Sequence, residues 1–329
     1  MGIVAVAGGT GQLGRTIVEE ILNRGGQEVI ILGRKAIPLM RYYITKANKN
    51  RQKDDAKAKE IGTRIVAIDY NNTSSIVSTL EENKVETVIA VLNLMGGIEP
   101  ELALISAADQ SKTTKRYIPS CWGVKCSPEI AAISPLDAAK LALLHAVEAT
   151  SLDSTSVING MFMDYYAPPG IKTHFPPLAF VLDMANNVAA IPGSGDVPVV
   201  FTYTFDVGRM AAALLTLPKW SKFYYIIGDR ATWNQVIQMA EETKAVKFDV
   251  KHDSVEMLKK GQVTELPSHI HLYPFFPKEQ LQGALSSLGV LFDNGGFDLK
   301  PAKGESLNEI FPEVKLTSMK DIIGAWKGK

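Results

Sequence analysis

The chain has 329 residues, of which 46% are hydrophobic and 21% charged, as is usual for a globular protein built as one large domain or two closely associated ones. Lys and Arg together number 35, and so do Asp and Glu, so the formal net charge is zero. This balance indicates neither a basic surface for nucleic acid nor an acidic tail. No apolar run approaches the length of a membrane span and no basic segment precedes the first apolar stretch. We therefore expect a cytoplasmic protein without a signal peptide or membrane anchor.

Short Val- and Ile-rich runs alternate with amphipathic segments along the chain. Because these runs do not alternate in polarity, they are typical of strands covered on both faces. The predicted strands are Ile3–Ala7, Glu28–Leu32, Arg64–Ile68, Thr87–Leu92, Arg116–Ile118, Thr155–Ile158 and Phe223–Ile227. The predicted helices are Arg15–Asn23, Glu99–Gln110, Pro135–Ala149, Trp233–Lys244 and Lys320–Trp326. This alternation predicts an α/β fold with a doubly wound parallel sheet of the Rossmann type.

Local signals define the ends of several of these helices. Gly25-Gly26 is a stop signal for the first. Ser134, with an acid at Asp137, is typical of a capped helix start. Thr232 and Gln235 repeat that signature before the helix at Trp233–Lys244.

A glycine-rich segment, GGTGQLG, follows the first predicted strand and opens the first helix. A turn with positive φ, close approach of the backbone to a pyrophosphate and tight helix–strand contact each need glycine. The amide groups at the helix N-terminus would bind the anion. Placed between a strand and a helix, the motif predicts dinucleotide binding. The residues expected to contact the dinucleotide are Gly8, Thr10, Gly11, Gln12, Leu13 and Gly14.

The end of the second strand discriminates between NAD and NADP. NAD-binding proteins usually place an acid there for the ribose hydroxyls, whereas NADP requires a cation. Here the strand runs into Arg34 and Lys35. A guanidinium can bind a phosphate through two N–H groups, and an ammonium adds charge. We therefore predict NADP(H), the alternative being a solvated basic pair.

Polar residues also follow the third and fourth strands, as Asp69-Tyr70 and Asn93-Leu94. Ligands of open α/β sheets bind at this carboxyl edge, so we expect these residues to line the cofactor site. In such positions Asp and Asn also commonly cap turns.

Two domains are expected. Residues 1–160 with about 200–240 would form the nucleotide-binding domain, to whose sheet Phe223–Ile227 would return. Proline-rich turns interrupt the pattern after Gly160, so residues 161–199 with 241–329 would form a smaller α/β substrate lobe. The charged segment 41–60 is either a solvated helix or a lid over the adenosine end.

Four further segments carry a family likeness: Lys115–Gly123 (KRYIPSCWG), Lys140 with the helix KLALLHAVE, Val157–Tyr165, and Phe205–Arg209 (FDVGR). With the glycine loop, they make the first 230 or so residues resemble the isoflavone reductase-like, NmrA-like family of atypical short-chain dehydrogenases, on its fungal side. The resemblance implies an NADP(H)-dependent reductase in which Lys140 is catalytic. It also implies that Ser120, Lys140, Asn159 and Phe162 lie at the cofactor.

The chain departs from the family pattern at several positions. Cys121 replaces the acid of the family's PSEFG motif, and Trp122 replaces its aromatic residue. Leu136 stands where the Tyr-x-x-x-Lys dyad of short-chain dehydrogenases has its tyrosine. Any catalysis must therefore centre on Lys140 or be of another kind. Taken without the resemblance, Lys140 is an ordinary helix lysine, although Leu136 and Leu144 make its face of the helix largely apolar.

An aromatic and apolar cluster follows the sixth predicted strand. Core packing is its simplest interpretation, and the alternative is a wall for the nicotinamide and a flat substrate. The candidate substrate residues are Trp122, Met161, Met163, Tyr165, Tyr166 and His174. Neither the two cysteines, Cys121 and Cys126, nor the histidines match a metal motif, so we expect reduced thiols and no metal site.

The sequence thus predicts an NADPH-dependent reductase that transfers hydride to a small, aromatic or polycyclic metabolite. We expect a monomer or homodimer that binds a small-molecule substrate and neither nucleic acid nor membrane. Two alternatives remain open: a non-catalytic NADP(H)-sensing regulator, and an enzyme that uses bound NADP(H) in a redox-neutral rearrangement or isomerisation.

Overall fold

The computed structural model describes residues 2–34 and 55–329. The helices, including the 3-10 helices marked η, are α1 Gln12–Arg24, α3 Thr73–Glu82, η2 Leu94–Gly96, α4 Glu99–Gln110, α5 Pro128–Ala131, α6 Pro135–Glu148, η3 Met163–Tyr166, α7 Thr204–Leu214, α8 Trp233–Lys244, α9 Val255–Lys259, η4 Pro267–Leu272, α10 Lys278–Asp293, α11 Leu307–Ile310 and α12 Met319–Gly324. The strands are β1 Ile3–Ala7, β2 Glu28–Arg34, β3 Ile65–Ile68, β4 Val85–Ala90, β5 Arg116–Ile118, β6 Asp153–Ser154, β7 Ser156–Ile158, β8 Met161–Phe162, β9 Leu182–Asp183, β10 Val188–Pro192, β11 Val199–Thr202, β12 Phe223–Tyr225, β13 Asp229–Ala231 and β14 Asp249–Asp253.

The chain forms two compact units, each assembled from three segments. The first contains Met1–Trp122, Ala139–Ser156 and Gly208–Phe223, and the second contains Gly123–Ala138, Val157–Val207 and Tyr224–Lys329. Residues 123–138, 157–160, 200–207 and 224–240, expected in the nucleotide-binding domain, thus belong to the second unit. The reason is packing: Trp233 of α8 lies 5.1 Å, centroid to centroid, from Phe201 in the core of that unit.

The first unit is built on a six-stranded sheet with the order β3-β2-β1-β4-β5-β6. Each pair of neighbouring strands is parallel. The strand order reverses between β1 and β4, which confirms the predicted doubly wound arrangement and places the ligand-binding edge at the carboxyl ends of these two strands.

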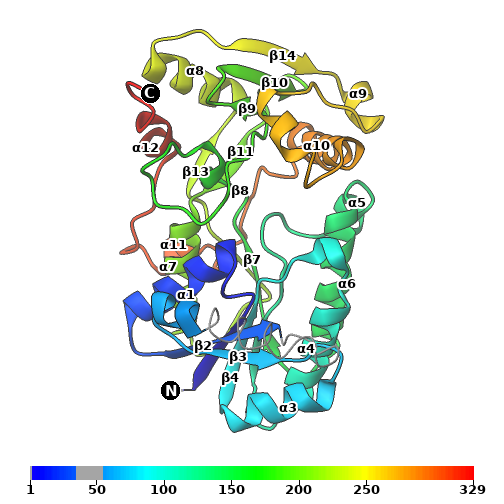
Figure 1. The fold of residues 1–329 in the computed structure, drawn as a ribbon, viewed down its shortest axis with the longest axis vertical. Coiled ribbons are helices and arrows are strands. Elements are labelled where there is room, and N and C mark those ends of the chain that lie inside the picture. Colours follow the sequence, from blue (N-terminus) through cyan, green and yellow to red (C-terminus); the bar gives the residue numbers. More distant parts are fainter. Residues whose placement is uncertain (1, 35–54) are drawn as a thin grey trace, which may run out of the picture. The chain divides into compact units, whose positions relative to one another are not determined.

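Helices cover both faces of this sheet, as right-handed crossovers require. One face packs against α3, α4 and α6, which supply Leu80, Leu104 and Leu143 to a buried apolar cluster. On the other face, Gly9 packs between Ile31 of β2 and Val18 of α1. Figure 1 shows α1 separate from the α3, α4 and α6 group. A sheet buried on both faces explains why its strands are continuously apolar.

The local signals determine several bounds as expected. The structure has β1, α4, β5 and α8 at the predicted residues. The Ser134 hydroxyl accepts a hydrogen bond from the Asp137 amide at 3.2 Å. Thr232 and Gln235 form a full capping box at the start of α8.

Replacing Thr232 by alanine should lower the free energy of unfolding by about 1 kcal/mol, because an amide at the start of α8 loses its acceptor. Urea unfolding followed by circular dichroism measures the difference. Thr243→Ala, in the last turn of the same helix, is the matched control and should change little. Equal stabilities of the two variants would contradict the assigned role of the cap.

Two expectations about strands were wrong. Phe223–Ile227 does not return to the six-stranded sheet, because β12 pairs with β7 in a separate two-stranded sheet. The chain changes partners around Thr155: Asp153 pairs with β5, whereas the Ser156 amide donates to the Lys222 carbonyl. The segment after Gly160, expected to be turns and irregular loops, contains β8, β9 and β10. Beyond residue 241 the chain forms β14 and the 16-residue helix α10.

The second unit contains two three-stranded sheets, β14-β10-β9 and β13-β11-β8. Its largest buried apolar cluster includes Tyr166, Phe201, Trp233 and Phe292, whose rings meet edge to face. Near the end of the chain, the Trp326 indole donates to the Tyr166 carbonyl at 2.6 Å. Within the described ranges, none of the helices has the length and apolar character needed to cross a membrane.

Candidate cofactor and catalytic site

The glycine loop lies where the strand order reverses. Gly8 has φ +81°, and a Cβ there would lie 2.2 Å from the Val91 carbonyl oxygen at the end of β4. A Cβ on Gly14 would lie 2.3 Å from the Gly8 carbonyl oxygen. Both positions therefore require glycine, because the loop packs tightly against β4 and against the start of α1.

Gly11 is less tightly packed than Gly8 and Gly14, and it is exposed. The nearest atom to a Cβ built on it is the Gly8 carbonyl oxygen at 3.3 Å. Gly11 is the N-cap of α1, whose first turn, Gln12-Leu13-Gly14, carries no acid. The Gly11 amide itself donates to the Gly8 carbonyl at 2.9 Å. Gln12 is exposed, Thr10 is half-buried and Leu13 is packed in the core, so the first-turn amides of α1 from Gln12 onward form a site suited to a pyrophosphate.

Arg34, the last residue of β2, is exposed at the same edge. Its neighbour Lys35 lies outside the described residues, as does most of the charged segment 41–60. Arg15 is engaged elsewhere, since it forms ion pairs with Glu19 at 2.9 Å and Glu60 at 2.7 Å. Among the described residues, Arg34 is therefore placed to bind a phosphate on the adenosine ribose and so to distinguish NADP from NAD.

The predicted residues after β3 and β4 act partly as caps. Asp69 accepts a hydrogen bond from the Asn71 amide, and Asn93 from the Met95 amide, each at 3.0 Å. Leu94 begins η2 and is half-buried. These residues lie at the edge where they were expected, but their carboxylate and amide oxygens already serve the turns.

The loop after β5 is held from several sides. The Ser120 hydroxyl accepts from the Leu92 amide at 2.8 Å. The Trp122 indole donates to the Ala90 carbonyl at 3.0 Å, so its buried ring is fixed against β4. The Cys121 thiol, 2% exposed, lies 3.3 Å from the Lys140 carbonyl oxygen. Cys121 and Cys126 are both free thiols.

Lys140 reaches this loop from α6. Its Nζ donates to the Trp122 carbonyl at 2.9 Å, and the side chain is half-buried. This contact orients the head group toward the loop after β5. The structure thus joins Lys140 to the loop of Ser120 and Trp122, which the sequence assigned to the site from a separate motif.

Sequence reasoning missed Glu101 in the first turn of α4. Its carboxyl is 1% exposed, and Oε1 accepts from the Ser120 amide at 2.8 Å. Burial raises its pKa to about 7, although the hydrogen bonds from Ser120 act in the opposite direction. Because acids are favoured in the first turn of any helix, nothing in the sequence indicates that this one is buried.

In the second unit, the Asn159 side chain forms hydrogen bonds with the backbone, including that of Gly123 directly after Trp122. Its Oδ1 accepts from the Gly123 amide at 3.0 Å, and its Nδ2 donates to the Gly160 carbonyl at 3.2 Å. Asn159 is fully buried. Its side chain therefore fixes the position of Gly123.

The aromatic residues of the second unit divide into two groups. Phe162, Tyr165, Phe175 and Phe180 are linked by ring contacts between 4.6 and 6.5 Å, and we call them the aromatic cluster. Their rings are at least partly accessible, except for Phe175, which is 9% exposed. Met161, Met163 and Tyr166 belong instead to the buried core of this unit. His174 stacks at 5.7 Å on Phe205.

Asp164, which the sequence did not single out, connects the segment around Thr173 to the start of α7 at Thr204. Its carboxylate accepts from the Thr204 amide at 2.9 Å, the Thr204 hydroxyl at 2.7 Å and the Thr173 hydroxyl at 2.6 Å. Burial raises its pKa and these hydrogen bonds oppose that effect. Asp164 thereby fixes the segment that carries His174 and Phe175.

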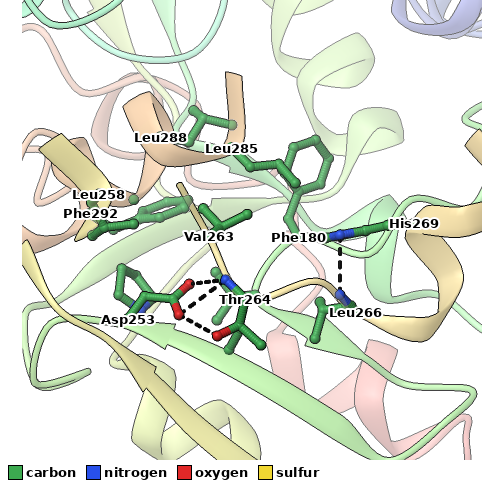
Figure 2. Close-up of a pocket in the computed structure, with 14 residues that line it drawn as sticks. Phe180, Asp253, Leu258, Val263, Thr264, Leu266, His269, Leu285, Leu288 and Phe292 are labelled. Carbon is green, nitrogen blue, oxygen red and sulfur yellow. Dashed lines mark hydrogen bonds between the residues drawn. The ribbon is translucent and has the colours of Figure 1, made fainter. Parts of the chain in front are cut away.

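Figure 2 shows a separate pocket within the second unit. It is lined by Phe180, Leu258, Val263, Leu285, Leu288 and Phe292, with Asp253 and His269 among the polar residues. Asp253 is hydrogen-bonded to Thr264, and His269 to the Leu266 amide and the Ala179 carbonyl. These polar groups already have partners, so the pocket suits only an apolar group.

The described residues of the first unit fit a dinucleotide. The loop provides tightly packed glycines and an exposed first turn of α1 at Gln12, and Arg34 lies at the end of the next strand. Across residues 2–34 and 55–329, no group of three or more His, Cys, Asp or Glu side chains could hold a metal ion.

Comparison with known proteins agrees with this geometry. The model of the NmrA-like family matches residues 2–323. Oxidoreductase BOA1 of Botryotinia fuckeliana is 32% identical over 314 residues, which cover 94% of this chain and 95% of that protein. Phenylcoumaran benzylic ether reductase TP7 of Nicotiana tabacum is 24% identical, covering 98% and 97%.

Solved structures share the fold. AtPrR2 with NADP+ and (+)pinoresinol has a TM-score of 0.73 at 21% identity, covering 99% of this chain and 98% of that one. The ternary complex of leucoanthocyanidin reductase from Vitis vinifera has a TM-score of 0.72 at 16% identity and covers 100% of both chains.

Proposed function

Because this chain belongs to the NmrA-like family, we propose that it is an NADPH-dependent reductase acting on a small, aromatic or polycyclic metabolite in the cytoplasm. The observation that carries the proposal is the glycine loop, which lies where the strand order reverses and leads into the first turn of α1, with Gly11 and Gln12 exposed. Relatives named oxidoreductase and benzylic ether reductase support the reaction class.

The first unit would bind the cofactor. Gly8 to Gly14 would hold the pyrophosphate, and Arg34, with Lys35, the phosphate on the adenosine ribose. Asp69, Tyr70, Asn93 and Leu94 would line the edge by backbone and apolar contact, because their polar side-chain atoms are engaged or buried. NADPH, when bound, supplies the hydride.

Lys140 would hold or donate the proton that the substrate oxygen gains. Hydride delivery to carbon builds negative charge on a carbonyl, phenolate or enolate oxygen, and an adjacent ammonium stabilises it. The Trp122 carbonyl fixes Lys140 Nζ at 2.9 Å and so orients the group before substrate arrives. The aromatic cluster and His174, all within the second unit, present rings of the kind that pack on flat aromatic molecules.

Incubation with NADPH and a set of aromatic ketones, enones and benzylic ethers tests the proposal. We expect loss of NADPH absorbance together with an equal amount of reduced product, identified by mass. A product of unchanged mass with no net loss of NADPH would instead establish the redox-neutral alternative. Tight NADP(H) binding with no turnover, and a protein partner that co-purifies, would indicate the sensor.

A further inference from the structure

Glu101 is the centre of a buried polar cluster behind the cofactor edge. Its Oε2 is buried, and none of the described residues donates a hydrogen bond to it. The hydroxyl oxygens of Tyr70 and Tyr117 are likewise buried and without a partner in the described part of the chain. An ionised carboxylate with one free oxygen is costly in such surroundings, so a proton on Glu101 stabilises the folded protein.

The groups around Glu101 come from neighbouring strand ends. Tyr117 belongs to β5, Tyr70 follows β3, and Cys121 lies in the loop after β5. Burial, followed by the charge of Glu101, raises the pKa of both tyrosines, whereas Arg34 lowers that of Tyr70. Both tyrosines are therefore neutral near pH 7, which leaves Glu101 as the group in this cluster that titrates there.

Two hydrogen bonds lead from Glu101 to Leu92, next to the strand end on which the glycine loop packs. Its Oε1 accepts from the Ser120 amide, and the Ser120 hydroxyl accepts from the Leu92 amide. The preceding residue, Val91, has the carbonyl against which Gly8 packs. A buried carboxyl is thus connected, through Ser120 and Leu92, to the strand end on which the glycine loop packs.

We infer that Glu101 is a positioning residue for the loop that holds Lys140, and that it takes up a proton when the dinucleotide binds. The neutral carboxyl fixes Ser120 and, through the backbone of residues 120–122, the Trp122 carbonyl that accepts from Lys140. Phosphate charge and exclusion of water both disfavour the carboxylate, so binding shifts Glu101 further toward the neutral form. This inference rests on the proposed function, because it needs NADP(H) to bind at the glycine loop.

Titration calorimetry of NADP+ in buffers of different ionisation enthalpy, together with affinities at pH 6.5 and 8.5, tests this linkage. At pH 7.5 roughly three quarters of Glu101 would be ionised before binding, so wild type should take up a large fraction of one proton. Its affinity should fall by about tenfold between pH 6.5 and 8.5. Glu101→Gln should match wild type at pH 6.5, show no uptake and keep its affinity at pH 8.5.

Glu99→Gln is the matched control, because Glu99 lies in the same helical turn and is exposed. It should behave as wild type. Glu101→Leu removes the acceptor for the Ser120 amide, so this variant should bind NADP+ weakly at every pH. If the leucine variant does not fold, Glu101→Gln still decides the test. Proton uptake by Glu101→Gln equal to that of wild type would overturn the inference, while binding itself would leave the cofactor assignment intact. Absence of NADP+ binding would overturn both.

The cofactor-free protein gives an independent readout. Because the folded-state pKa of Glu101 lies above its unfolded value of about 4.5, the stability due to its proton is complete below pH 4.5 and is lost as pH rises through about 7. Relative to Glu101→Gln, the unfolding equilibrium constant of wild type should rise on the order of a hundredfold across that range. Parallel pH dependences for the two proteins would contradict a buried, protonated Glu101.

Discussion

Replacing Lys140 by alanine is expected to lower kcat by at least about a hundredfold, with the fold, the NADPH affinity and KM nearly unchanged. The ammonium lies 2.9 Å from the Trp122 carbonyl and is thus held in one direction. Charge that develops on the substrate oxygen in the transition state would lose its donor, whereas ground-state binding would lose little. Stopped-flow and steady-state measurements on a substrate found in the screen give kcat and KM separately.

Lys140→Arg should remain nearly as slow, because guanidinium holds its proton too tightly to donate it and cannot place it at the same point. Lys112→Ala removes an exposed lysine of the same unit and should turn over at the wild-type rate. If Lys140→Ala also turned over at that rate, Lys140 would serve only to brace the loop through Trp122, and the proton would come from elsewhere.

The second large effect concerns Arg34. Replacing it by alanine should weaken NADPH binding by roughly 10- to 150-fold, because a charge-assisted contact to the extra phosphate is worth about 1.5–3 kcal/mol. NADH lacks that phosphate, so its affinity should hardly change. Wild type should therefore prefer NADPH, and Arg34→Ala should lose most of the preference. Titration calorimetry with both cofactors measures the four affinities.

Arg24→Ala, an exposed arginine at the end of α1, controls for the loss of a positive charge and should leave the preference intact. A wild type that binds NADH as tightly as NADPH would refute the assignment of Arg34. If Arg34→Ala lost affinity for NADPH and NADH by the same factor, Arg34 would contact the part of the dinucleotide that the two cofactors share.

The first half of the fold could be predicted because its signals are local. A continuous apolar run identified β1, and the capping pair Thr232 and Gln235 indicated the start of α8. In the later segments this information is weaker. β8 and β9 have two residues each, and four of the five residues of β14 are exposed, so neither length nor burial marks them in the sequence.

For the candidate site, position along strands and helices predicted more than residue type did. Two sequence motifs predicted that Ser120, Trp122 and Lys140 belong to one site. In the structure Lys140 donates to the Trp122 carbonyl, and Ser120 and Trp122 are hydrogen-bonded to the end of β4. It could not distinguish Glu101 from the exposed Glu99 two residues earlier, because burial there arises from packing under Ser120. Nor could it reveal that the tight packing at Gly8 depends on a carbonyl from another strand.

The discontinuous make-up of the first unit has a consequence for how the protein is made. Its last segment, Gly208–Phe223, is synthesised long after β1 and α1, yet Gly208 packs so closely on α1 that a Cβ there would lie 3.0 Å from the Thr16 carbonyl oxygen. While the ribosome is still translating the first 207 residues, that surface of α1 has no cover. The nascent chain must therefore pass through a state in which the first unit is incomplete, and in which chaperones or aggregation compete for it. A shortened gene encoding only residues 1–160 should for the same reason give an insoluble product rather than a nucleotide-binding module.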